Sequence, residues 1–368
     1  MFCEETLYSV ALRHCPLIGD LIFRRLVGEA GSAKEVWELS KSGLKNIYGI
    51  GKKISFEIGK AEHLLFAEKE LSFCEKNNIT INLRHLGHLP THLNECEDAP
   101  AVLYQKGNLD SSLSAVSIVG TRNITTYGKS FISDFLADVK THKILTVSGL
   151  ALGADTEVHE VSINNNIPTA AVLAHGFHTM YPSKNRRLAD KILEDGGVLL
   201  TEFNSSQKPD RENFIQRNRI IAGISPATIV VETAFGGGSV STATFANNYN
   251  REVFALPGKI TDKYSQGCNQ LIFQNKAAAI STVSGLAEQL GLHKTEQTGV
   301  LFPSSEIRIK LPEQQLILLE ALDKNTPLSL DDVSLKLDVP AYRILPDLLE
   351  LELLGYIRAL SGRQYLAL

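Results

Sequence analysis

The chain has 368 residues, of which 43% are apolar and 21% are charged, and it carries a formal net charge of -4. This length allows two or three domains and a large buried core. A mildly acidic chain can bind a polyanion only through a local basic patch, so net charge alone argues against a nucleic-acid partner.

The first residues and the cysteines indicate the compartment. Glu4 and Glu5 stand where a secretory signal would carry Lys or Arg, and no stretch is apolar for the roughly 18 residues that a membrane span needs. The five cysteines are odd in number and form no C-x-x-C pair. We therefore expect a soluble, reduced, cytoplasmic protein without membrane contact.

Residues 1–84 are predicted to form a helical domain, because apolar residues recur there at helical spacing. Within it, I-Y-G-I-G-K-K at 47–53 has the form of a helix-hairpin-helix loop. Gly49 and Gly51 permit tight turning, and Lys52 and Lys53 can face a DNA phosphate. A plain turn between scaffold helices accounts for the same residues equally well, so both interpretations stay open.

Strands and helices alternate through residues 85–291. An amphipathic helix at 127–140 follows the first strand, as in a crossover connection. Near-continuous apolar strands separated by such helices predict an α/β fold with a Rossmann-like, doubly wound, mainly parallel sheet. The predicted strands are 115–119, 144–148, 169–174, 198–202, 228–232 and 252–256.

A linker is expected at 292–311, followed by a winged-helix domain at 312–368 with three helices and a hairpin. Its third helix, 341–354, carries Asp347, Glu350 and Glu352 against Arg343 alone. Phosphate would be repelled by this net negative helix, so we favour a protein contact over DNA recognition for this domain.

Glycine-rich turns follow three of the predicted strands, in A-V-S-I-V-G-T-R (115–122), L-T-V-S-G-L-A-L-G-A-D (145–155) and I-V-V-E-T-A-F-G-G-G-S-V-S-T-A (229–243). In a parallel sheet these turns lie at the carboxyl ends of the strands, where free amides and helix N-termini attract anions. Gly120 would let the backbone approach a ligand, and Arg122 can hold a phosphate through two donors. The centre of the chain is therefore predicted to bind phosphates.

A cationic turn is expected at the same edge of the sheet. Y-P-S-K-N-R-R at 181–187 places three cations within four residues. Tyr181, together with Phe177 and His178, supplies flat faces on which unpaired bases could stack. A solvated helix start is the alternative, and the position on the sheet edge favours phosphate binding.

A further arginine pair lies in F-I-Q-R-N-R-I-I-A-G at 214–223. A helix that buries Ile220 and Ile221 is expected to leave Arg217 and Arg219 bracketing Asn218 at the edge of the cleft. Buried arginines need an anion. An ion pair with Glu202 or Glu232 is an equally good role for one of the two.

A hydrolase interpretation is weak. Asp155 and His159 lie one helical turn apart after Ser148, but V-S-G-L-A is no G-x-S-x-G elbow and nothing marks an oxyanion hole. We expect Asp155 and His159 to lock the loop and helix in place, and we expect no catalytic residue.

A metal interpretation is weak as well. Pro90 breaks any helix that would align His85, His88, His92 and Cys96. No second cysteine or histidine pair completes a site. We therefore expect neither a metal nor another cofactor.

Seven motifs, taken in order, resemble the DNA-processing protein A family (DprA, also called Smf). The resemblance covers the whole sheet domain, and the family often has a helix-hairpin-helix or SAM-like module before it and a winged helix after it. Two segments depart from the family pattern. T-E-F at 201–203 keeps a hydroxyl in Thr201, and G-G-G-S at 236–239 keeps the backbone accessible to a ligand. The motifs are S-I-V-G-T-R with Y-G, S-G-L-A-L-G-A-D with His159, Y-P-S-K-N, F-I-Q-R-N-R-I-I-A-G, G-S-V-S-T-A, L-P-G and G-C-N-Q-L-I.

The resemblance implies a non-enzymatic protein that binds single-stranded DNA entering the cell during natural transformation. It would protect that strand and load the RecA recombinase onto it, displacing single-strand binding protein. A homodimer formed through the sheet domain is also implied. By motif, the DNA-binding residues would be Gly120, Arg122, Ser148, Gly149, Lys184, Asn185, Arg217, Asn218, Arg219, Gly238 and Ser239.

Two other functions stay open. A nucleotide hydrolase of the lysine-decarboxylase-like group shares this sheet and uses a P-G-G-x-G-T-x-x-E loop, but A-F-G-G-G-S at 234–239 lacks the proline and the downstream glutamate. A winged-helix regulator that senses a nucleotide would bind duplex DNA through residues 312–368.

Overall fold

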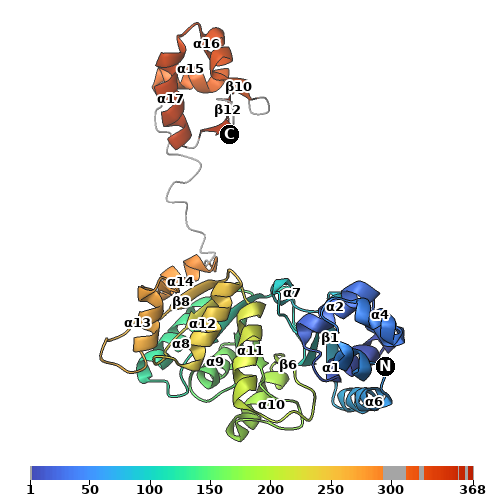
Figure 1. Ribbon diagram of the computed structural model, residues 1–368. Coiled ribbons are helices and arrows are strands. Elements are labelled where there is room, and N and C mark those ends of the chain that lie inside the picture. Colours follow the sequence, from blue (N-terminus) through green and yellow to red (C-terminus); the bar gives the residue numbers. More distant parts are fainter. Residues whose placement is uncertain (1, 293–311, 323–326, 355, 361–363, 368) are drawn as a thin grey trace. The chain divides into compact units, whose positions relative to one another are not determined.

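The computed structural model describes residues 2–292, 312–322, 327–354, 356–360 and 364–367. The chain divides into two compact units, Met1–Lys294 and Thr295–Leu368 (Figure 1). None of the helices that the structure describes combines the length and the apolar character needed to cross a membrane.

The described part of the first unit contains a nine-stranded sheet in the order β1-β2-β6-β5-β4-β3-β7-β8-β9. β2 pairs antiparallel with both β1 and β6, and the remaining pairs are parallel. The chain runs outward from β3 to β6 and then returns to β7 on the other side, so the strand order reverses between β3 and β7. The strands are β1 (Ile79–Leu83), β2 (Val102–Gly107), β3 (Ser114–Val119), β4 (Ile144–Ser148), β5 (Thr169–Val172), β6 (Val198–Thr201), β7 (Ala227–Val230), β8 (Glu252–Ala255) and β9 (Ala278–Ala279).

Helices cover both faces of this sheet (Figure 1). Helices α11 (Arg211–Ile224), α12 (Gly238–Asn248) and α13 (Gln266–Phe273) share one apolar core with the strands. On the other face, α8 (Thr126–Val139), α9 (Ala154–Asn164) and α14 (Val283–Gln289) form a second core, and α10 (Arg186–Glu194) packs beside α9. Strands buried on both faces account for the near-continuous apolar runs, and the predicted doubly wound, mainly parallel sheet is confirmed.

All six predicted strands are present, and β1, β2 and β9 are additional. β1 alternates, with Ile79, Ile81 and Leu83 buried, but its five residues directly follow a long helix. Five residues of alternating apolar and polar character are too few to distinguish a strand from the end of the preceding helical pattern. The sequence therefore predicts only helices there. β9 has only two residues, too few for a sequence pattern.

The described residues before β3 form seven helices, and most of these share a core with β1 and β2. Buried Glu70 in α6 accepts hydrogen bonds from the amide and hydroxyl of Ser205, each at 2.6 Å, which ties these helices to the loop after β6. The helices are α1 (Glu4–His14), α2 (Asp20–Ala30), α3 (Ala33–Glu38), α4 (Lys41–Asn46), α5 (Lys52–Glu57), α6 (Ala61–Lys76) and α7 (Thr91–Glu95).

The second unit contains α15 (Glu313–Ala321), α16 (Leu330–Leu337) and α17 (Ala341–Leu353). Its described strands, β10 (Leu328–Ser329), β11 (Ile357–Leu360) and β12 (Gln364–Ala367), pair in the order β10-β12-β11. Ser329 and Asp332 form a capping box at the start of α16. Three helices with a hairpin confirm the predicted winged helix, whereas the predicted linker after Leu292 lies outside the described residues.

Candidate nucleic-acid interface

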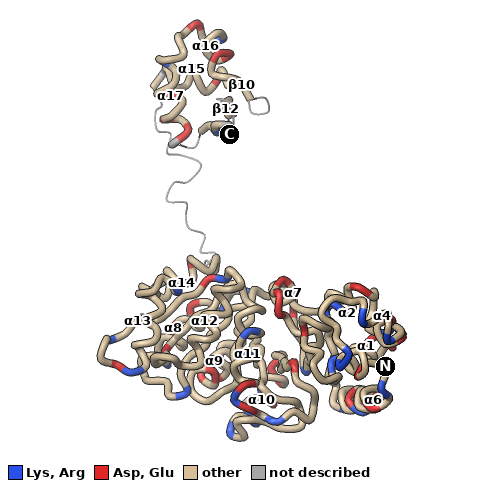
Figure 2. The backbone as a smooth tube through the Cα atoms, in the orientation of Figure 1, with Lys and Arg blue, Asp and Glu red and all other residues tan. Residues whose placement is uncertain are grey.

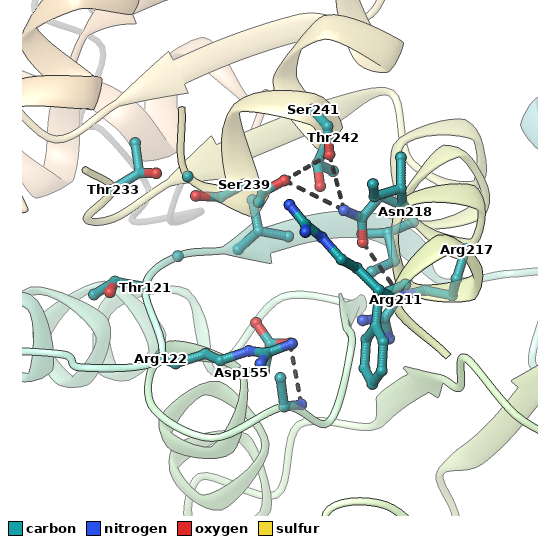
Figure 3. Close-up of a pocket in the computed structure, with 18 of the residues that line it drawn as sticks. Thr121, Arg122, Asp155, Arg211, Arg217, Asn218, Thr233, Ser239, Ser241 and Thr242 are labelled. Atoms are coloured by element: carbon teal, nitrogen blue, oxygen red, sulfur yellow. Dashed lines mark hydrogen bonds between the residues drawn. The ribbon is translucent and has the colours of Figure 1, made fainter. Parts of the chain in front are cut away.

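A pocket of about 770 Å³ lies where the strand order reverses. It is lined by the loops after β3, β4 and β7 and by the first turns of α11 and α12 (Figure 3). In doubly wound sheets this crevice at the carboxyl ends of the strands is the usual ligand site. The three glycine-rich turns thus meet at one edge, as the sequence predicts.

Two glycines let the first two loops pack together. A Cβ on Gly120 would lie 2.7 Å from the Cβ of Ala154, and one on Gly153 would lie 2.4 Å from the Thr121 carbonyl oxygen. Gly153 also has a φ of 82°, which side chains rarely adopt. Gly120 lines the pocket, but close packing against α9 accounts for its missing side chain.

Carboxylates already occupy the N-terminal ends of α8 and α9. Glu232 accepts hydrogen bonds from the amide (2.8 Å) and the hydroxyl (2.6 Å) of Thr125, just before α8. Asp155, in the first turn of α9, accepts from the Ala151 amide at 3.2 Å. Burial raises the pKa of Asp155, and the nearby Arg217 opposes that shift.

The N-terminal end of α12 is open in contrast. It has no side-chain cap and no acidic residue in its first turn. Among the described residues, the amides of Gly238 and Ser239 have no acceptor, and the buried Ser239 hydroxyl has no partner. An uncapped helix start with free amides attracts anions, so this is where an anion fits best in the pocket.

Arg217 forms the floor of the pocket and is only 3% exposed. Its Nη1 donates to the carbonyl oxygens of Gly149, at 2.6 Å, and Val172. A Cβ on Gly149 would lie 2.5 Å from that nitrogen, so the guanidinium fills the space that a side chain would take. Burial lowers the pKa of Arg217 to about 10, and Asp155 opposes the shift, so Arg217 is cationic at neutral pH.

Arg122 and Arg211 are the exposed cations of the pocket. Figure 3 shows their side chains extending into it from the β3 loop and from the start of α11. Among the described residues, neither has a carboxylate within 4.0 Å. Their charges are available to a ligand.

An aromatic ring, Phe214, lies beside two of the arginines that line the pocket. The guanidinium carbon of Arg122 is 5.2 Å from the centre of the Phe214 ring, and that of Arg217 is 5.7 Å away. Tyr181 meets the same ring edge-on at 5.8 Å and also lines the pocket. Of the three predicted stacking residues, Phe177 and His178 do not line it; His178 packs on Phe73 instead.

Asn218 joins α11 to the start of α12. Its Nδ2 donates to the Gly238 carbonyl at 3.3 Å and to the Ser241 hydroxyl at 3.0 Å. It lines the pocket together with Gly238 and Ser239, as predicted from the sequence.

Arg219, in contrast, does not line the pocket. It donates to Glu202 at 2.5 Å and to Asp20 at 3.1 Å, so the ion pair that the sequence left open for one arginine is formed here. Residues two apart on a helix point about 200° apart, so Arg217 and Arg219 could not both face the cleft. Burial raises the pKa of Glu202 to about 7, and Arg219 opposes that shift.

Ser148, Lys184 and Asn185 also lie outside the pocket lining. The buried Ser148 hydroxyl donates to the Ile118 carbonyl at 2.7 Å. Buried Asn185 donates to the Leu150 carbonyl and the Thr156 hydroxyl, each at 2.9 Å, and so holds the loop after β4. Lys184 is exposed on the neighbouring turn.

Ser148, His159 and Asp155 do not form a catalytic relay. His159 Nδ1 lies 2.7 Å from the Thr169 hydroxyl, its other ring nitrogen has no partner among the described residues, and Ser148 donates to backbone. Burial, with a smaller contribution from Arg217, lowers the pKa of His159 to about 3. A neutral, enclosed imidazole of this kind supports the loop.

Sequence reasoning missed Arg211 and Phe214 as pocket residues. Together with Asn218 they have the i, i+3, i+7 spacing of residues on one helix face. This spacing could have identified them from the sequence as neighbours of Asn218 in the pocket. The arginine-rich R-N-R run directed the prediction to neighbouring positions instead.

The family model for DNA recombination-mediator protein A matches residues 80–291, and the model for the DprA winged helix domain matches residues 303–363. Protein Smf from Escherichia coli (strain K12) is 34% identical over 302 residues, which is 80% of this chain and 79% of that protein. The X-ray structure of DNA processing protein A from Streptococcus pneumoniae has a TM-score of 0.66 at 29% identity and covers 77% of this chain and 98% of its own. A structure of DNA processing protein A from Helicobacter pylori, concerned with the single-stranded DNA binding mode of that protein, has a TM-score of 0.51 at 25% identity and covers 58% of this chain and 95% of its own.

Proposed function

The chain belongs to the DNA recombination-mediator protein A family, and we propose that it binds single-stranded DNA in the pocket between β3 and β7. One observation carries this proposal: Arg122 and Arg211 extend into the pocket without a carboxylate partner among the described residues, beside the Phe214 ring and the open start of α12. This arrangement joins phosphate donors to a surface for a base.

Phosphates would bind to the two exposed arginines and to the start of α12. Arg122 and Arg211 can each donate two hydrogen bonds to a phosphate. The amides of Gly238 and Ser239, together with the unpartnered Ser239 hydroxyl, would donate to a second phosphate oxygen or to the next phosphate. These contacts are independent of base sequence.

Unpaired bases would stack on Phe214 and Tyr181. Phe214 is half-buried, and Tyr181 is 46% exposed at the pocket rim. Stacking on aromatic rings needs a base whose face is free, and base pairs in a duplex hide their faces. This requirement is the physical reason to expect a preference for single strands.

The other residues predicted from the sequence would act indirectly. Arg217 forms the floor, Gly149 lies outside the lining and accepts a hydrogen bond from Arg217, and Ser148 and Asn185 hold the loops. Arg219 would position α11 through its ion pairs, and Lys184 would attract the strand from the neighbouring turn. The direct contacts that we propose are Gly120, Arg122, Asn218, Gly238 and Ser239, with Arg211 and Phe214 added.

We further propose, from the family resemblance, that the protein protects incoming DNA during natural transformation and loads RecA in place of single-strand binding protein. It would do so without enzymatic activity and as a homodimer. Ile260 and Phe273, which are 84% and 86% exposed in the segment after β8, offer apolar surface for self-association.

The winged helix is better suited to a protein than to DNA. Its α17 exposes Tyr342, Leu345 and Leu349, and the same helix carries Asp347 and Glu350. The carboxylates would repel phosphate, and the exposed apolar side chains among them favour contact with a protein surface.

Substituting Arg122 tests the proposed pocket. Arg122→Ala should weaken binding to a fluorescent 20-nucleotide oligo-dT, measured by anisotropy, and should reduce the dependence of log K on log salt by about 0.7, the value for one single-strand phosphate contact. Lys140→Ala is the matched control, because it removes an exposed cation at the opposite end of α8.

Equal binding and equal salt dependence in wild type and Arg122→Ala would contradict the proposal. The same preparations should leave nucleoside monophosphates intact, and hydrolysis abolished by Arg122→Ala would instead favour a nucleotide hydrolase. Removal of residues 312–368 should leave oligo-dT binding in place, and its complete loss would favour a winged-helix regulator.

A further inference from the structure

The segment between Glu38 and Glu57 contains Lys41, Lys45, Lys52 and Lys53 and no Asp or Glu. In a chain with a net charge of -4, this is a concentrated run of positive charge. The run covers α4, the turn at 47–51 and α5. Figure 2 colours the Lys and Arg residues blue along the backbone, and α4 of this segment is labelled there.

The turn itself is rigidly built. The Ile50 amide donates to the Ile47 carbonyl at 3.1 Å, and Gly49 has a φ of 82°. Leu44 and Ile50 are buried on either side of the turn. Lys45, Tyr48, Lys52 and Lys53 are exposed around them, Tyr48 at 83%.

Arg25 of α2 closes over this turn. Its Nη1 donates to the Tyr48 carbonyl at 2.9 Å, and its guanidinium carbon lies 5.1 Å from the centre of the Tyr48 ring. A Cβ on Gly49 would meet the same guanidinium nitrogen at 2.5 Å, but that flexible side chain could move, and the φ of 82° is what favours glycine here. A fifth cation thus joins the lysines at the surface.

These charges are not neutralised within the described part of the protein. In the described ranges, no carboxylate lies within 4.0 Å of the side-chain nitrogens of Arg25, Lys45, Lys52 or Lys53. All four residues are exposed. Elsewhere in the same helical region, Arg13, Lys34 and Lys60 each pair with a carboxylate. Among the described residues, four exposed cations without a carboxylate partner are thus concentrated on and around this one turn.

We propose that Arg25, Lys45, Tyr48, Lys52 and Lys53, here called the hairpin surface, bind the phosphate backbone of duplex DNA. Lysines on an outward turn match the closely spaced, rigid phosphates of a duplex. Two exposed aromatic rings lie in the segment between Glu38 and Glu57, and each already has a cation against one face: Arg25 on Tyr48 and Lys60 on Phe56. Two partly covered rings do not form the series of stacking faces that a flexible single strand would need. This contact lies beyond the pocket and does not depend on the function proposed for it.

The test uses the full chain and a fluorescent, blunt-ended 20-base-pair duplex, with anisotropy measured from 50 to 250 mM NaCl. Lys52→Gln/Lys53→Gln should lower the slope of log K against log salt by about 1.8, from about 0.9 per duplex phosphate contact, and should weaken binding at 0.1 M salt by about tenfold or more. Lys69→Gln/Lys76→Gln is the matched control, because it removes two exposed lysines from α6 of the same helical region.

The two proposals fail separately. The hairpin variant should bind oligo-dT as wild type does, whereas Arg122→Ala should bind the duplex as wild type does. Two results in Lys52→Gln/Lys53→Gln would overturn the duplex contact. One is an unchanged slope of log K against log salt for the duplex, and the other is a loss of affinity for oligo-dT alone. If circular dichroism shows that the double variant is unfolded, Lys45→Gln tests the same surface with an expected slope change of about 0.9.

Discussion

Replacing Phe214 by alanine removes a ring that Arg122, Arg217 and Tyr181 all contact. Stacking of one base on an aromatic ring contributes about 1–3 kcal/mol, so we expect Phe214→Ala to weaken oligo-dT binding about five- to 150-fold. Phe214 carries no charge, so the slope of log K against log salt should stay at its wild-type value. Anisotropy titrations of the oligo-dT probe at several salt concentrations measure both quantities.

Two further substitutions at this position separate stacking from packing. Phe214→Tyr keeps an aromatic face and should bind nearly as wild type does, whereas Phe214→Leu keeps apolar volume without the face and should resemble the alanine variant. Equal affinity of the leucine variant and wild type would refute the stacking argument. A changed salt slope in Phe214→Ala would show that the ring acts by placing Arg122.

The remaining predictions concern charge at the pocket and stability beneath it. Arg211→Ala should weaken oligo-dT binding and lower the salt slope by about 0.7, as anisotropy would show, and an unchanged slope would remove Arg211 from the contacts. Burial raises the pKa of Glu202 to about 7. The unfolded value is near 4.3, so the folded protein binds more protons between these pH values, and the free energy of unfolding should fall as pH rises from about 4 to 7. Glu202→Gln should remove this contribution, at most about 4 kcal/mol, and urea unfolding at pH 5 and pH 7.5 should show a smaller difference for the variant than for wild type.

The central sheet was predictable because its strands are buried on both faces. Val116, Ile118 and Val119, or Ile229 and Val230, form short apolar runs between helical segments, and such runs are typical of central parallel strands. β1 was not predictable in the same way, because its alternation is short and its partner β2 begins about twenty residues later. Pairing across that distance is set by tertiary packing against α6 and not by local sequence.

The site was predicted in outline but not in the roles of its residues. Glycine-rich turns located the correct edge of the sheet, and Arg122, Gly238 and Ser239 line the pocket there. Helical geometry, if applied strictly, would have separated Arg217 from Arg219 and pointed to Arg211 and Phe214. The sequence could not show that Glu232 occupies the start of α8, because Thr125 lies 107 residues earlier and meets this carboxylate only in the folded sheet. Asp155 differs, because its partner Ala151 is four residues away in the same loop.

A crystal structure of the full chain with a short oligo-dT would show where the strand binds. We expect phosphates within hydrogen-bond distance of Arg122, Arg211 and the first amides of α12, with a thymine stacked on Phe214. A strand bound elsewhere on the chain, with this pocket empty or closed by side chains, would contradict it.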